Sequence, residues 1–194
     1  MSIHTIEPGL LLAAPRLGDP SFEGSVVLLG AHEEGGSIGW TINGAEVASA
    51  AEIVRATGIV PAGGELPSSF ERPALRGGPV SPESVWIVYR RASGEELLPG
   101  SLEIGSEIAV TSTLDALRML IGGGGPAEVR LVIGYAGWGP GQLEDEVSKG
   151  AWLPAEADAA LLFEDATSTL WQRAYAKTIG SIPAAFVGKA RGSA

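Results

Sequence analysis

At residues 129–141 the chain reads VRLVIGYAGWGPG. Four of the first eight positions hold β-branched or aromatic residues, so this segment predicts the strongest strand of the protein. Glycines then interrupt the strand, and Pro140 stands at a position favoured for the first residue of a helix. Leu143 and Val147 lie four residues apart, which predicts the buried side of that helix. The segment therefore predicts a strand, a tight turn and a helix in succession.

The segments on either side predict further strands and helices. Two short apolar runs, residues 10–14 and 25–29, predict strands that are buried on both faces. Residues 37–43 follow the turn-prone Glu-Glu-Gly-Gly sequence and predict a hairpin with the second strand. Helical spacing of apolar residues predicts three more helices, and shorter apolar runs predict two more strands. These are helices over 47–54, after Ser112 and after Ser168, and strands at 73–76 and 85–89.

The length and composition of the chain indicate how many domains it forms and where it is located. With 194 residues, 45% of them hydrophobic and 19% charged, the chain is predicted to form one domain over 1–194, with flexible ends at 1–7 and 183–194. The N-terminus has no signal-peptide pattern, and no stretch of about 18 apolar residues suits a membrane span. We therefore expect a cytoplasmic location and no contact with a membrane.

Two glycine-rich motifs are similar to patterns found in enzymes, but the residues around each argue against a catalytic role. Residues 35–39 match the G-x-S-x-G pattern of a serine nucleophile, but that turn needs a strand before the serine and a helix after it, whereas a strand follows here. Residues 122–125 are four glycines without the lysine that contacts phosphate, so they predict a connector. The chain has no cysteine and two histidines, so we expect no bound metal and no cofactor.

The order of the motifs resembles the YqgE/AlgH family of bacterial proteins. The segments that carry the resemblance are 14–17, Asp19-Pro20, Phe22, 25–27, His32, Gly36, Ile42-Asn43, 77–80, 134–138, 141–144, Glu146, 151–153, Leu162-Phe163 and Trp171. Gly44 and Gly150 depart from it, since lysine and asparagine are common there. The resemblance implies an α/β fold of the α+β type, in which a bent, split, barrel-like mixed sheet has helices packed outside. The family is largely uncharacterised and often labelled transcriptional regulators.

Polar and aromatic residues of the shared motifs are the candidate binding residues. They are Asp19, His32, Asn43, Tyr135, Trp138, Gln142 and Glu146. We predict that these segments converge into a groove of a non-catalytic regulatory or binding protein, with a protein or small molecule as its unidentified partner. The alternative is a hydrolase that uses His32 as base with Asp19 or Glu146, which requires a carboxylate within hydrogen-bond reach of His32 in an open pocket. A third possibility is that these residues have structural roles alone. Asp19 would then cap a turn, Asn43 would lie in a turn, and His32 would be hydrogen-bonded inside the core.

Direct recognition of DNA is not expected, although the family label suggests it. The formal charge is −10 and the pI about 4.6, so the average surface repels phosphate backbones. One basic strip exists after Ala166, with Arg173, Lys177, Lys189 and Arg191, but no motif presents a reading helix. We therefore predict that any regulatory effect acts through a protein partner.

Overall fold

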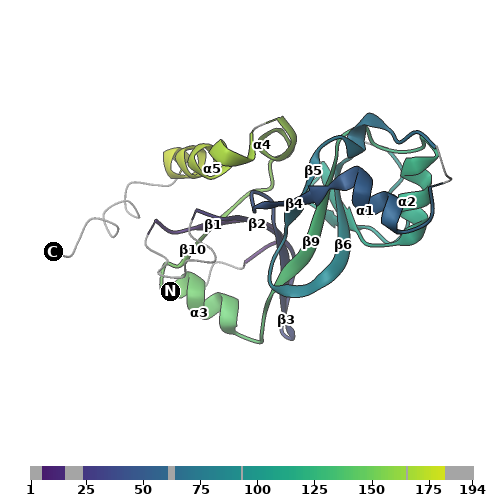
Figure 1. The fold of residues 1–194 in the computed structure, drawn as a ribbon. Coiled ribbons are helices and arrows are strands. Elements are labelled where there is room, and N and C mark those ends of the chain that lie inside the picture. The colour runs from purple at the N-terminus through teal and green to yellow at the C-terminus, as the bar shows by residue number, and fades with distance from the viewer. Residues whose placement is uncertain (1–5, 16–23, 61–63, 93, 165, 182–194) are drawn as a thin grey trace.

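Strand β9 (Val129–Trp138) is the strand predicted at residues 129–136, and it joins two parts of one sheet (Figure 1). Its first half pairs with β6 (Val80–Arg90) on one side and with β5 (Pro73–Arg76) on the other. Its last residues pair with β3 (Gly36–Thr41) instead. The strand changes partners near Gly134, whose φ is 71° and where a Cβ atom would lie 2.7 Å from the carbonyl oxygen of Gly78. Only glycine fits this position without strain.

The computed structural model describes residues 6–15, 24–60, 64–92, 94–164 and 166–181. Within them the sheet curls into a half-barrel with the strand order β10-β1-β2-β3-β9-β6-β8-β7, and β4 pairs with β5 beside it. Every pairing among these strands is antiparallel except that of β5 with β9. The remaining strands are β1 (Gly9–Ala13), β2 (Val26–Glu33), β4 (Glu46–Ser49), β7 (Leu102–Ile104), β8 (Ile108–Thr111) and β10 (Trp152–Ala155).

Helices pack against the outside of this sheet, which matches the predicted fold class. At one end of the molecule α4 and α5 lie on one side of β1 and β2 while α3 lies on the other, and α1 and α2 lie at the opposite end (Figure 1). The helices are α1 (Ala50–Ala56), the 3-10 helix η1 (Ser68–Phe70), α2 (Leu114–Ile121), α3 (Gln142–Ser148), α4 (Ala159–Glu164) and α5 (Thr167–Ser181).

Strand β1 is buried on both faces, as its uninterrupted apolar sequence predicted. Leu10 and Leu12 join a core that includes residues of α4 and α5, whereas Leu11 and Ala13 join a second core beneath Leu143 of α3. A third core lies under α1 and α2 against β6, β8 and β9. Because side chains alternate along a strand, a strand between two helical layers needs apolar residues at every position.

Several predicted boundaries were wrong. Helix α1 begins at Ala50, because Val47 belongs to the short strand β4. Thr113, and not Ser112, caps α2, where its side chain accepts a hydrogen bond from the N–H of Ala116. Helix α3 begins at Gln142, so Pro140 belongs to the turn before it. Strands β7, β8 and β10 and helix α4 were not predicted, because they are short and their sequences carry weak periodicity.

The predicted flexible ends, residues 1–7 and 183–194, lie outside the described residues except for Ile6 and Glu7. Ile6 is buried in the core beneath α3. Across the described parts of the chain, no helix combines the length and the apolar character needed to cross a bilayer.

Candidate functional site

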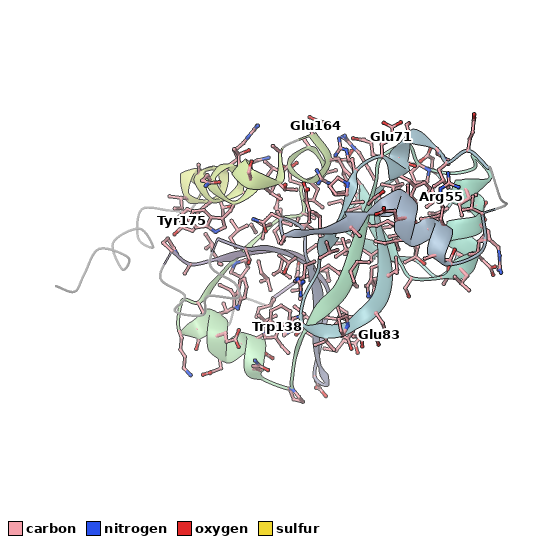
Figure 2. All side chains as sticks on the ribbon, viewed as in Figure 1. Arg55, Glu71, Glu83, Trp138, Glu164 and Tyr175 are labelled. Carbon is pink, nitrogen blue, oxygen red and sulfur yellow. The ribbon has the colours of Figure 1, made fainter. Side chains whose placement is uncertain are left out.

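The carboxylate of Glu146 is the centre of a cluster of polar and aromatic side chains. Its Oε2 atom accepts hydrogen bonds from the indole N–H groups of Trp138, at 3.0 Å, and Trp152, at 2.8 Å. Its Oε1 atom accepts a hydrogen bond from the side-chain amide of Gln142 at 2.8 Å. We call these four residues the Glu146 cluster. It connects α3 with β9 and β10, and Trp138 lies at the end of β9 that leads into α3 (Figure 2).

Local sequence explains how these four side chains meet. Gln142 and Glu146 are four residues apart on α3 and so share one face of the helix. The Gln142 side chain also accepts a hydrogen bond from the backbone N–H of Gly139 at 3.0 Å, which fixes the turn between β9 and α3. The two tryptophans are 6% and 4% exposed, so their indole N–H groups need a partner inside the protein. Glu146 supplies that partner.

His32 lies beside the Glu146 cluster, on the hairpin of β2 and β3. It pairs in register with Ser37, which in turn pairs with Trp138 on β9. The Nδ1 atom of His32 is 2.8 Å from the hydroxyl oxygen of Ser37, and its Nε2 atom is 3.7 Å from the carboxylate of Glu144 on α3. The His32 side chain is 14% exposed and that of Glu144 is 46% exposed.

The chemistry open to His32 follows from these distances. The contact with Ser37 is a good hydrogen bond, and it polarises the hydroxyl if Nδ1 accepts the proton. The contact with Glu144 exceeds the range of a hydrogen bond, so that carboxylate attracts the imidazole without fixing its tautomer. Glu146 does not orient His32 either, because the contacts of the imidazole are with Ser37 and Glu144.

Two candidate residues lie away from this site. Asn43 contacts Val26 at the opposite end of β2. Val26 and His32 are six positions apart, which is about 20 Å at the usual rise of a strand. The Asn43 side chain accepts a hydrogen bond from Val26 N–H at 2.8 Å and donates one to the carbonyl of Gly24 at 2.9 Å. Tyr135 packs edge-on against Trp86, in the core on the other side of the sheet from Trp138.

Four of the seven candidate residues therefore lie together. The structure brings His32, Trp138, Gln142 and Glu146 together, and Asp19 lies outside the described residues. It also adds Ser37, Glu144 and Trp152, which the sequence analysis left out of the site. Ser37 could have been predicted from the sequence. A two-residue turn after Glu33 places Ser37 opposite His32 in the hairpin. Among the described residues, no group of three or more His, Asp or Glu side chains is arranged to hold a metal ion.

Comparison with known proteins agrees with the resemblance seen in the sequence. A family model described as AlgH-like matches residues 10–183. The chain belongs to the AlgH-like family. A UPF0301 protein of Anaeromyxobacter dehalogenans (strain 2CP-C) is 34% identical over 185 residues, which cover 94% of this chain and 92% of the relative. A UPF0301 protein of Xanthomonas campestris pv. campestris (strain B100) is 37% identical over 165 residues, or 85% of each chain.

Solved structures share the fold of this family member. The solution structure of the AlgH protein from Pseudomonas aeruginosa matches with a TM-score of 0.69 and 30% identity, over 100% of this chain and 99% of that one. The crystal structure of a protein from Corynebacterium diphtheriae matches with a TM-score of 0.70, over 88% of this chain and 85% of that one. Its identity of 20% establishes likeness of fold alone. None of these descriptions states an activity.

Proposed function

We propose that this member of the AlgH-like family is a binding protein and not an enzyme. The observation that carries the proposal is the occupation of both carboxylate oxygens of Glu146 by three side-chain donors. These three hydrogen bonds tie Glu146 to both tryptophans and to Gln142, so its carboxylate holds α3 and the preceding turn in a fixed position. A surface held rigid in this way loses little entropy when it binds a partner.

The surface that this cluster holds in place is the binding face of the proposal. It consists of exposed residues of the β2–β3 turn, of the turn before α3 and of α3 itself: Glu33, Glu34, Gly35, Gly139, Pro140, Gly141, Gln142 and Glu144. We call it the hairpin–α3 face. Its ionisable side chains are acidic, so a protein partner with a basic surface fits it best. Any effect on transcription then runs through that partner, in keeping with the net charge of −10.

Site-specific cross-linking in the native host tests this proposal. A photoreactive residue in place of Glu34 or Glu144 is expected to capture the same protein, and Glu34→Lys or Glu144→Lys is expected to abolish its co-purification. Glu52, an exposed acid on α1 at the other end of the molecule, provides the matched control position. Equal capture from position 52, or co-purification that survives both charge reversals, would contradict the proposal.

A hydrolase is the second candidate, because one observation favours it. The 2.8 Å contact between Ser37 and His32 is the geometry of a nucleophile beside its base, with Glu144 on the far side of the imidazole. A fluorophosphonate probe, which phosphonylates activated serines, distinguishes the two candidates. The binding proposal predicts no labelling of Ser37. Stoichiometric labelling that disappears in both Ser37→Ala and His32→Gln would establish the hydrolase and overturn the binding proposal.

A further inference from the structure

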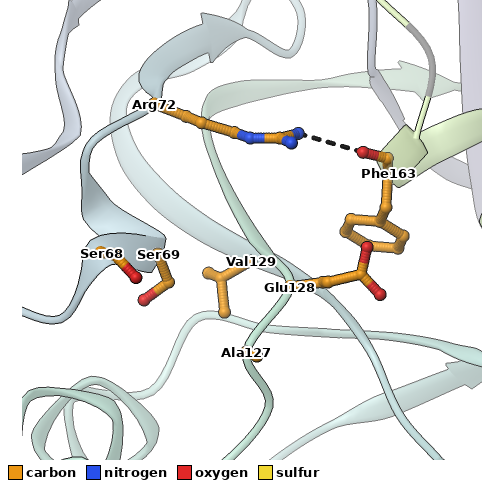
Figure 3. A pocket seen from close by; sticks show the side chains of 7 residues that line it. All are labelled: Ser68, Ser69, Arg72, Ala127, Glu128, Val129 and Phe163. Carbon is orange, nitrogen blue, oxygen red and sulfur yellow. Dashed lines mark hydrogen bonds between the residues drawn. The ribbon is translucent and has the colours of Figure 1, made fainter.

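A small cavity lies well away from the Glu146 cluster, between η1, the start of β9 and the end of α4. Its volume is about 110 Å³, and Ser68, Ser69 and Arg72 line one side while Glu128 and Phe163 line the other (Figure 3). One water takes about 30 Å³ of liquid, so the cavity has room for a group of the size of a tetrahedral oxyanion. We call this cavity the Arg72 pocket.

Hydrogen-bond donors dominate the polar side of the pocket. One guanidinium N–H of Arg72 donates to the carbonyl of Phe163 at 3.1 Å, and no carboxylate among the described residues lies within ion-pair distance of Arg72. The hydroxyls of Ser68 and Ser69 make no side-chain hydrogen bond to any described residue. A planar guanidinium with free N–H groups beside two hydroxyls matches the acceptor oxygens of phosphate.

Two neighbouring guanidinium groups supply positive charge on the Arg72 side of the pocket. Arg130, on β9, is 8% exposed, and its burial together with the charge of the nearby Arg72 lowers its pKa to about 10. Two guanidinium groups thus repel each other in a protein that is acidic overall. The carboxylate on the wall, Glu128, is 3.3 Å from Arg90, which also contacts Glu107 at 3.5 Å and Glu164 at 3.1 Å. Arg90 therefore offsets part of the negative charge of that wall.

We propose that the Arg72 pocket binds a phosphate group, either free or at the end of a phosphomonoester, through the guanidinium of Arg72 and the hydroxyls of Ser68 and Ser69. This site is independent of the hairpin–α3 face. It gives the chain a small-molecule ligand in addition to the protein partner proposed above.

Titration of the full chain with inorganic phosphate, followed by ¹H–¹⁵N correlation spectra, tests the site. Potassium chloride at equal ionic strength is the reference. We expect saturable shifts confined to the amides of residues 68–72 and 127–129. Arg72→Gln is expected to weaken phosphate binding at least about tenfold, because a charged hydrogen-bonding group is lost. Phosphoserine in a parallel titration distinguishes the sources: tighter binding than inorganic phosphate assigns the pocket to a phosphomonoester, and weaker binding to the free ion.

Arg55→Gln is the matched control, because Arg55 is also exposed and donates to one backbone carbonyl, that of Gly64, at 3.1 Å. Its phosphate affinity is expected to equal that of the unmodified protein. If Arg72→Gln does not fold, the double variant Ser68→Ala, Ser69→Ala takes its place, with an expected loss of about threefold. Shifts that chloride reproduces, shifts that map elsewhere, or unchanged affinity in the folded pocket variants would overturn the proposal.

Discussion

Trp138 and Trp152 pack edge to face, with ring centroids 6.0 Å apart and planes inclined at 81°, although their strands are far apart in the sheet. Trp138 lies on β9 and Trp152 on β10, and three strands separate β9 from β10 in the strand order. The two rings meet because the sheet curls beneath α3, and both indoles then bond to one oxygen of Glu146. The Glu146 cluster thus links β9 and β10 to α3.

Replacement of Glu146 tests this role. Glu146→Ala leaves two buried indole N–H groups without an acceptor, and we expect a loss of about 2 to 4 kcal/mol in the free energy of unfolding. Glu146→Gln keeps one acceptor oxygen and is expected to lose about half as much. Urea unfolding followed by tryptophan fluorescence measures both. Glu144→Ala, on the same helix but outside the cluster, is expected to stay within about 0.5 kcal/mol of the unmodified protein.

Asn43 stabilises the start of β2 through two hydrogen bonds, and two variants distinguish their contributions to stability. Asn43→Ala removes the acceptor for Val26 N–H and the donor to Gly24, so we expect a loss of about 1 to 3 kcal/mol. Asn43→Asp keeps the acceptor and loses the donor, so its stability is expected to lie between that of the unmodified protein and that of Asn43→Ala. Chemical denaturation measures the order. Equal stability of the alanine variant and the unmodified protein would contradict this role.

Gly134 allows β9 to change partners, and alanine there is expected to be costly. A left-handed conformation costs a residue with a Cβ atom about 1 to 2 kcal/mol. Overlap with the carbonyls of Gly78 and Val80, at 2.7 and 2.9 Å, adds about 1 to 3 kcal/mol. Gly150 has a similar φ of 75° but open space around its Cβ position, so Gly150→Ala reports the conformational cost alone. Thermal unfolding of both variants should rank Gly134→Ala clearly below Gly150→Ala.

Asp158 connects α4 with α5 in a pH-dependent way. Its burial works to raise its pKa, but hydrogen bonds from Lys177 and from the N–H of Leu161 outweigh burial, so the pKa lies below its ordinary value of 3.8. A carboxyl group with a lowered pKa stabilises the fold above its unfolded pKa and loses that contribution as pH falls through the folded one. The stability gap between the unmodified protein and Asp158→Asn should therefore hold from pH 7 to 5 and shrink below 3.8.

Urea unfolding at pH 7, 5 and 3 measures that gap. Asp158→Asn keeps a side chain that caps α4, whereas Asp158→Ala loses the cap as well and should be about 1 kcal/mol less stable than the asparagine variant at pH 7. Lys177→Gln removes the partner on α5 and should show the same pH dependence as Asp158→Asn. A gap that persists unchanged at pH 3 would mean that the charge of Asp158 contributes nothing to the link between the helices.

Local sequence determined the elements with the clearest patterns. The runs at residues 10–14, 25–29 and 129–136 became strands because both of their faces are buried, so nearly every position in them had to be apolar. The hairpin and the final helix followed from turn residues and helical spacing. The ordered motifs were sufficient to indicate the family. Pro140 and Ser112 misled the prediction because capping depends on the geometry of the preceding chain, which a short motif does not fix.

Only the tertiary structure decided which polar side chains meet. Asn43, Tyr135 and Trp138 all belong to shared motifs, yet strand alternation and strand length place them on different faces and at different ends of the sheet. Glu146 became a structural acceptor because the sheet curls until β9 and β10 bring two indoles to it. The contact between Arg72 and Phe163 joins residues 91 positions apart. Hydrophobic patterns are local and can be read along the chain, whereas the partner of a polar group depends on how distant elements fold together.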